Sequence, residues 1–179
     1  MLLNAGCIYQ RIASGVLNLK QELGGTIMLT MNEKDKNEML EAILKENEAY
    51  QCKLWAVIMA GADTYALIGG LSTLTGGAAA ALGALSNAYC YLGVTEKHLN
   101  MVIVNSVNVS KIENRLSLPL SSITKAEVKG GLLPGRKVVM LHFGKEKMKI
   151  SLMNNAIGSD IQGQKENVEM FCQIVSKLG

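Results

Sequence analysis

The stretch VVMLHFGKEKMKISLM at residues 138–153 decides the fold, because it has the pattern of two antiparallel strands joined by a tight turn. The run before the turn at residues 144–146 is mostly apolar, and after the turn polar and apolar residues alternate with the two-residue period of a strand that has one buried face. In the second strand we expect three side chains to point inward, those of Met148, Ile150 and Leu152. The intervening Lys147, Lys149 and Ser151 are expected to point outward.

Upstream of this hairpin, short apolar runs alternate with turn residues, which predicts further antiparallel strands. The first is the run CKLWAVIMA at residues 52–60, which ends at Gly61. Later strands are predicted at residues 89–94, 99–104, 116–120 and 123–128. Val107 and Val109 alternate with polar residues and are also expected to be strand material.

The chain closes with a helical pattern at residues 164–178. Its apolar side chains form one stripe, made by Val168, Phe171, Cys172, Val175 and Leu178. That stripe needs a surface to cover. We therefore predict a mainly β (α+β) fold, a bent antiparallel sheet or partly open barrel capped by the C-terminal helix.

A second, shorter helix is expected before the first strand. From Asn32 onward the pattern becomes helical, with Asn32 or Asp35 able to cap its start. The apolar face of this helix is formed by Met39, Leu40, Ile43 and Leu44.

Residues 61–88 form a glycine- and alanine-rich insertion after the first strand, with a single charged residue, Asp63. Glycine, serine and threonine dilute the apolar stretch, and basic residues are missing near its ends, so a membrane span is disfavoured. Three interpretations stay open. The insertion packs on its own domain, self-associates into a homo-oligomer, or contacts lipid through residues 64–86.

Residues 1–31 are interpreted as a translated leader or an N-terminal extension, and residues 32–179 as the domain. The first 27 residues do not have the pattern of a signal peptide. Gly24 and Gly25 can be encoded by a ribosome-binding sequence a short distance before Met28, so Met28 or Met31 is a candidate natural start. The alternative is an amphipathic helix at about residues 8–23.

Charge is distributed unevenly along the chain. The formal net charge is only +3, which does not indicate nucleic-acid binding. Residues 95–150, however, carry ten Lys or Arg against four acids. The candidate binding residues are the cations around the predicted turns of this region: Lys125, Lys129, Arg136, Lys137, Lys145, Lys147 and Lys149. They either attract an anionic lipid surface or an acidic partner, or form the solvated face of a sheet.

Catalysis and metal binding find little support in the sequence. The four cysteines, Cys7, Cys52, Cys90 and Cys172, show no metal-ligand spacing and are expected to be buried thiols in a reducing cytoplasm. His98 and His142 have no catalytic partner at a recognisable spacing. We therefore expect no catalytic residues, no metal and no cofactor.

Three segments resemble bacterial PH-like domain proteins. They are GVTEKHLNMVIV at residues 93–104, LPLSSITKAEVKGG at 118–131 and QKENVEMFCQIV at 164–175. Thr95, Glu96, Lys97, His98 and Leu99 match the turn into the second strand of that family, and Leu118 to Ile123 match a later segment. The resemblance covers about residues 38–178.

The resemblance implies an intracellular, non-catalytic module that binds lipid headgroups, peptides or other proteins. Members that bind phosphoinositides carry Lys and Arg in the loop between the first two strands, whereas here none lies between Lys53 and Lys97. We therefore predict a cytoplasmic binding or adaptor module whose partner is a protein or an anionic lipid surface. The alternative is a peripheral protein at the inner face of the membrane, using residues 64–86 and a basic strand face.

Overall fold

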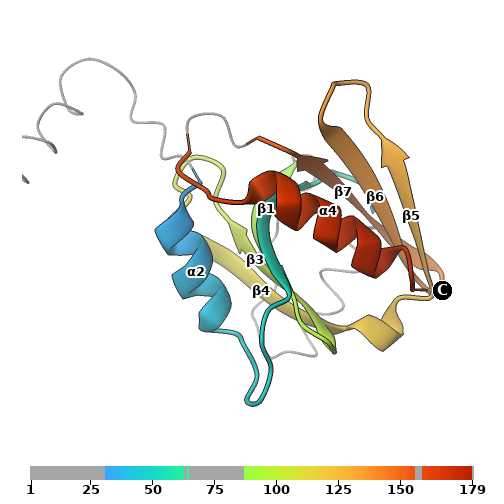
Figure 1. Ribbon diagram of the computed structural model, residues 1–179, viewed down its shortest axis with the longest axis horizontal. Helices are drawn as coiled ribbons and strands as arrows, with labels where there is room; N and C mark the ends of the chain where they lie inside the picture. Colours follow the sequence, from blue (N-terminus) through green and yellow to red (C-terminus); the bar gives the residue numbers. More distant parts are fainter. Residues whose placement is uncertain (1–30, 63, 65–86, 156–158, 179) are drawn as a thin grey trace, which may run out of the picture.

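The computed structural model describes residues 31–62, 64, 87–155 and 159–178 (Figure 1). In this part of the chain the strands form one 7-stranded sheet in the order β4-β3-β2-β1-β7-β6-β5, with every pairing antiparallel. The strands are β1 Cys52–Ile58, β2 Ala88–Val94, β3 His98–Val104, β4 Ile112–Pro119, β5 Lys125–Gly130, β6 Arg136–Phe143 and β7 Glu146–Met153. A short 3-10 helix, η1 (Leu120–Ser122), joins β4 to β5.

The sheet is bent and open rather than a closed barrel. β1 pairs with β2 over its full length, but it pairs with β7 only at Val57 and Ile58. The strands β4 and β5 end the sheet on either side and do not pair with each other. The sequence-based prediction of a bent antiparallel sheet is thus confirmed, and β1 is the strand at which its two halves meet.

The C-terminal helix α4 (Gln164–Val175) covers the inner face of the sheet, where it packs on β1 and β7. Its predicted stripe is buried there against alternate residues of the strands, including Leu54, Leu141 and Ile150. Leu178 lies beyond the helix and is partly buried in the same cluster. The predicted cap of the sheet is therefore confirmed.

The N-terminal helix α2 (Glu33–Glu41) covers the opposite, outer face and packs on β1, β2 and β3. Asn32 caps it, because its Oδ1 accepts a hydrogen bond from the Asp35 backbone N–H at 2.8 Å. Leu40 and Tyr91 are fully buried in this second, smaller core. The helix ends at Glu41, so Ile43 and Leu44 lie in the following turns and not in the helix as predicted.

Other local predictions are corrected by the structure. Val107 and Val109 are in turns, because the Asn105 side-chain oxygen accepts hydrogen bonds from the backbone N–H groups of Val107 and Asn108. Ser151 points to the outer face as expected but is buried, since the Arg136 side chain lies over it and donates to its Oγ at 2.9 Å.

Most of the insertion at residues 61–88 and all of the extension at residues 1–30 lie outside the described residues. The interpretations of those segments therefore remain predictions. Within the described part of the chain, no helix is long and apolar enough to cross a membrane. Cys52, Cys90 and Cys172 are buried and free, as expected, and burial raises the pKa of the Cys52 and Cys90 thiols to about 12.

Candidate functional site

The half of the sheet formed by β5, β6 and β7 carries all seven candidate cations, but the structure does not place them on one face. Paired residues of antiparallel strands share a face, and successive residues alternate between faces. The register pairs Lys125 with His142, Lys129 with Val138 and Lys149 with Met140. Five of the cations therefore share the outer face, opposite α4: Lys125, Lys129, Arg136, Lys147 and Lys149. We call this surface the cationic face.

The other two candidates point elsewhere. Lys137 pairs with the core residue Leu152, so it faces the inner side of the sheet and α4. Lys145 lies in the β6–β7 turn, next to Gly144, whose φ of 66° is in the left-handed region that glycine adopts readily. The seven cations are close in sequence and were therefore predicted to act together. Because successive residues of a strand point to opposite faces, the structure places Lys137 on the other face.

Glu127 is the one carboxylate that β5, β6 and β7 contribute to the cationic face. Lys125 Nζ lies 2.9 Å from its Oε1 and Lys129 Nζ lies 3.0 Å from its Oε2. Hydrogen bonds from these two ammonium groups lower the pKa of Glu127 to about 2. The carboxylate thus neutralises only part of the charge, and both lysine side chains remain well exposed, at 62% and 74%.

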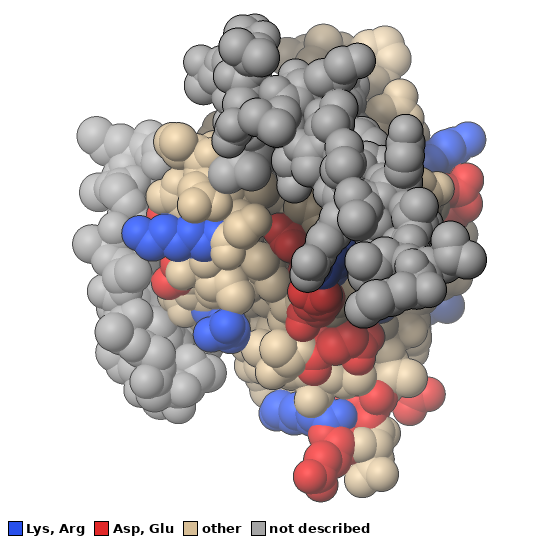
Figure 2. Space-filling model, turned by 90° about the vertical axis from the view of Figure 1, so that its left-hand side faces the viewer, with Lys and Arg blue, Asp and Glu red and all other residues tan. Residues whose placement is uncertain are grey.

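Acidic side chains gather at the other half of the sheet. The sequence of α2, EKDKNEMLE, contains four carboxylates against two lysines, and one of these, Lys36, is buried and paired with Glu33 at 2.8 Å. Figure 2 views the side of the molecule on which α2 lies, and red side chains collect there. The molecule therefore has an acidic half around α2 and a basic half around β5, β6 and β7.

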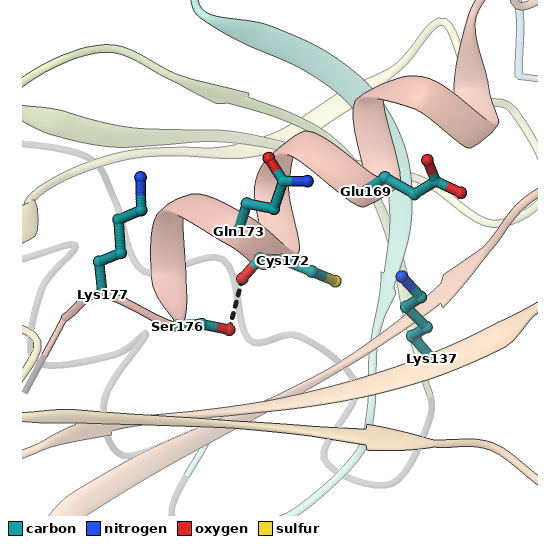
Figure 3. Close-up of a pocket in the computed structure, with 6 residues that line it drawn as sticks. All are labelled: Lys137, Glu169, Cys172, Gln173, Ser176 and Lys177. Carbon is teal, nitrogen blue, oxygen red and sulfur yellow. Dashed lines mark hydrogen bonds between the residues drawn. The ribbon is translucent and has the colours of Figure 1, made fainter.

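A groove of about 510 Å³ lies on the inner side, between β6 and the end of α4 (Figure 3). It is lined by Lys137, Glu169, Cys172, Gln173, Ser176 and Lys177. Burial raises the pKa of the Cys172 thiol, and the nearby Lys137 only partly offsets this. A protonated thiol is a weak nucleophile.

His98 belongs to a polar network with Glu48, Lys45 and Thr95. Its Nδ1 lies 2.7 Å from Glu48 Oε1, and its Nε2 lies 2.9 Å from Lys45 Nζ. Because an ammonium group can only donate, Nε2 accepts and Nδ1 carries the proton. The Thr95 hydroxyl donates to the other oxygen of Glu48, and this hydrogen bond, with His98 beside it, holds the pKa of Glu48 below its usual value.

This network fastens the loop between α2 and β1 to the turn between β2 and β3. Thr95 Oγ1 also accepts hydrogen bonds from the backbone N–H groups of Lys97 and His98. The matched residues Thr95 to His98 therefore have a structural role here. Among the described residues no group of His, Cys, Asp and Glu side chains is placed to hold a metal ion.

Comparison with known proteins gives no family for this chain. No protein-family model matches the sequence, and no curated protein matches it. Among solved structures, the hSac2 domain from human phosphoinositide phosphatase Sac2 is similar over 93% of this chain and 79% of that chain, with 12% sequence identity and a TM-score of 0.44. A likeness this distant carries no functional conclusion.

Proposed function

We propose that this chain is a non-catalytic binding module of the PH-like type that acts in the cytoplasm, at the anionic inner surface of a membrane. The observation that carries the proposal is the cationic face, which gathers Lys and Arg from three adjacent strands around a single carboxylate. The resemblance noted in the sequence supports the PH-like class.

A charged sheet face suits a lipid surface better than a single small anion. Its cations come from three strands that form one continuous sheet surface. The groove described between β6 and α4 is lined by none of these five cations. A membrane carrying anionic lipid attracts each nearby Lys or Arg by about 1 kcal/mol. The acidic half around α2 is repelled by the same surface, so the molecule would approach in one orientation.

Vesicle co-flotation of the full chain tests this proposal. We expect binding to vesicles that contain phosphatidylserine, weak binding to phosphatidylcholine alone, and loss of binding at high salt. Lys125→Glu with Lys129→Glu should weaken binding by roughly tenfold or more, from about 1 kcal/mol per charge. Lys34→Glu on α2 is the matched control, since Lys34 is also well exposed, at 77%, but lies in the acidic half.

A protein-binding adaptor is the second candidate, favoured by the groove between β6 and α4 with its charges of both signs. The same experiment separates the two functions. If the wild-type chain stays unbound in the presence of anionic vesicles at low salt, the membrane function is excluded. The groove then becomes the contact to test, with Lys137→Glu and Lys177→Glu.

A further inference from the structure

The hairpin that joins β5 to β6 ends in an exposed apolar tip, with the sequence GGLLPG at residues 130–135. Leu132 is fully exposed and Leu133 is 56% exposed, and Leu132 is the most exposed large apolar side chain of the described residues. In Figure 1 this loop projects at the upper right, on the far side of the molecule from α2. Single exposed leucines are common on proteins, but adjacent leucines at a projecting tip form a concentrated apolar point.

The turn has a defined geometry that holds the leucines outward. Gly131 N–H donates to the Arg136 carbonyl at 2.8 Å, and Arg136 N–H donates to the Leu133 carbonyl at 3.1 Å. Gly135 has a φ of 73°, which glycine accommodates without strain, and its carbonyl accepts from Asn154 N–H at 2.9 Å. The hairpin is thus anchored to the end of β7, and the tip presents its leucines from a fixed base.

Cations flank this tip on both faces of the hairpin. Lys129 and Arg136 lie on the cationic face, and Lys137 lies on the inner face. The Arg136 side chain passes over Gly131, where an added Cβ would lie 2.7 Å from its Cγ. Its Nε is held by Ser151 Oγ at 2.9 Å. Positive charge is therefore fixed directly behind the leucines.

From this arrangement we infer that the β5–β6 tip inserts into an anionic lipid bilayer, with Leu132 and Leu133 entering the acyl region and Lys129, Arg136 and Lys137 binding headgroup phosphates. This inference deepens the proposed membrane function and rests on it. It supplies the apolar contribution that the cationic face lacks. An apolar point backed by cations matches the depth profile of a membrane, in which the charged headgroups lie outside the hydrocarbon.

A bilayer fits this tip better than a protein partner does. A stable protein interface buries about 800 Å² on each partner, which two leucines at a projecting tip cannot supply. A bilayer needs no complementary pocket, because it deforms around an inserted side chain. A different exposed apolar residue provides the contrast: Val107 is 80% exposed, but it lies near the acidic helix α2, where Ser110 donates to Asp35.

Fluorescence quenching tests the insertion directly, because the chain contains only one tryptophan, Trp55. The variant Leu132→Trp is mixed with phosphatidylserine-containing vesicles whose acyl chains are brominated. We expect a blue shift and strong quenching of the new tryptophan. The Trp55 indole N–H is buried, so the wild-type chain should show little quenching, and Val107→Trp is the matched control in the acidic half.

A binding measurement with the same vesicles separates the inference from the function on which it rests. Leu132→Ser with Leu133→Ser should weaken binding by roughly a hundredfold, from the transfer free energy of the two side chains. A circular dichroism melt checks that this variant folds. The inference is overturned, and the proposed function stands, if the wild-type chain binds anionic vesicles while the double variant binds equally well and Leu132→Trp is not quenched.

The remaining outcomes are also decisive. If the wild-type chain does not bind anionic vesicles at all, the proposed function fails and the inference fails with it. If the double serine variant changes only the sedimentation of the protein, from oligomer to monomer, the tip joins two copies of this chain and the membrane inference is overturned. Quenching of Leu132→Trp but not of Val107→Trp supports insertion.

Discussion

At the scale of single residues, Thr95 shows how one hydroxyl group can hold two segments together. Thr95 is completely buried. Its Oγ1 accepts hydrogen bonds from the backbone N–H groups of Lys97 and His98, and its hydroxyl donates a hydrogen bond to the Glu48 carboxylate. Glu48 in turn holds His98 at 2.7 Å. Removing the hydroxyl would leave buried donors and a carboxylate oxygen without their partner, which costs more than the net value of one hydrogen bond.

Thr95→Val should therefore destabilise the protein by about 1–3 kcal/mol, although its shape hardly changes. Urea unfolding followed by circular dichroism measures the loss. Thr124→Val is the control for the same chemical change. Thr124 Oγ1 donates to the His142 carbonyl at 3.2 Å, but this bond is exposed to water, so little should be lost. Equal effects of the two variants would contradict the role given to the Thr95 network.

At the scale of elements, the first residue of α4 completes the sheet where β1 and β7 diverge. The Gln164 side chain accepts a hydrogen bond from Trp55 N–H at 3.1 Å. It donates to the carbonyls of Trp55 and Met153, each at 3.0 Å. A buried amide thus takes the place of a neighbouring strand, because buried backbone groups must be paired.

Gln164→Met keeps the length of the side chain but leaves these backbone groups unpaired. We expect a loss of roughly 3 kcal/mol in the free energy of unfolding, from the cost of several unmet hydrogen bonds. Gln173→Met, on the same helix but exposed, should be nearly neutral. A similar loss in both variants would mean that helix propensity, and not the bridge between β1 and β7, is responsible.

The elements themselves could largely be predicted from the sequence, because alternation in strands and the stripe of the C-terminal helix are local signals. One failure has a local cause and the other a long-range cause. The alternation at Val107 and Val109 predicted a strand, but the Asn105 side chain accepts hydrogen bonds from the backbone of the following residues and so forms turns there. The bridging role of Gln164 had no sequence signal, since it depends on where β1 leaves β7, more than a hundred residues away.

The candidate site could be predicted in outline only. The surplus of cations in residues 95–150 pointed to the correct half of the molecule. The faces of Arg136 and Lys137 could not be predicted, because the predicted strand begins at Val138 whereas β6 begins at Arg136. The exposed tip could also be predicted from the sequence. Its two leucines lie in a glycine- and proline-rich turn between cations, where no strand or helix is expected to bury them.

At the scale of the whole molecule, the separation of charge matters more than the net charge of +3. The acids of α2 and the cations of β5, β6 and β7 lie at opposite halves of one sheet, and the leucine tip lies in the basic half. Such a distribution orients a protein near a charged surface even when the total charge is small. The proposed membrane contact depends on this orientation, so single charges in the two halves should have unequal effects.

Glu127→Gln tests this asymmetry, because it removes the carboxylate that pairs with Lys125 and Lys129. Affinity for phosphatidylserine vesicles should rise by roughly fivefold, because one negative charge is removed from the surface that approaches the anionic membrane. Glu38→Gln is the matched control. Glu38 also pairs with an exposed lysine, Lys34, at 3.8 Å, but in the acidic half, where the change should be small.

The gain from Glu127→Gln should also be the same at pH 7 and pH 5. Because the pKa of Glu127 is lowered to about 2, its carboxylate is charged at both pH 7 and pH 5. The wild-type protein therefore differs from the neutral variant by one charge at either pH. Vesicle titration at the two pH values measures the ratio of affinities. Equal gains from Glu127→Gln and Glu38→Gln would show that net charge alone sets binding, and the oriented approach through the cationic face would then be wrong.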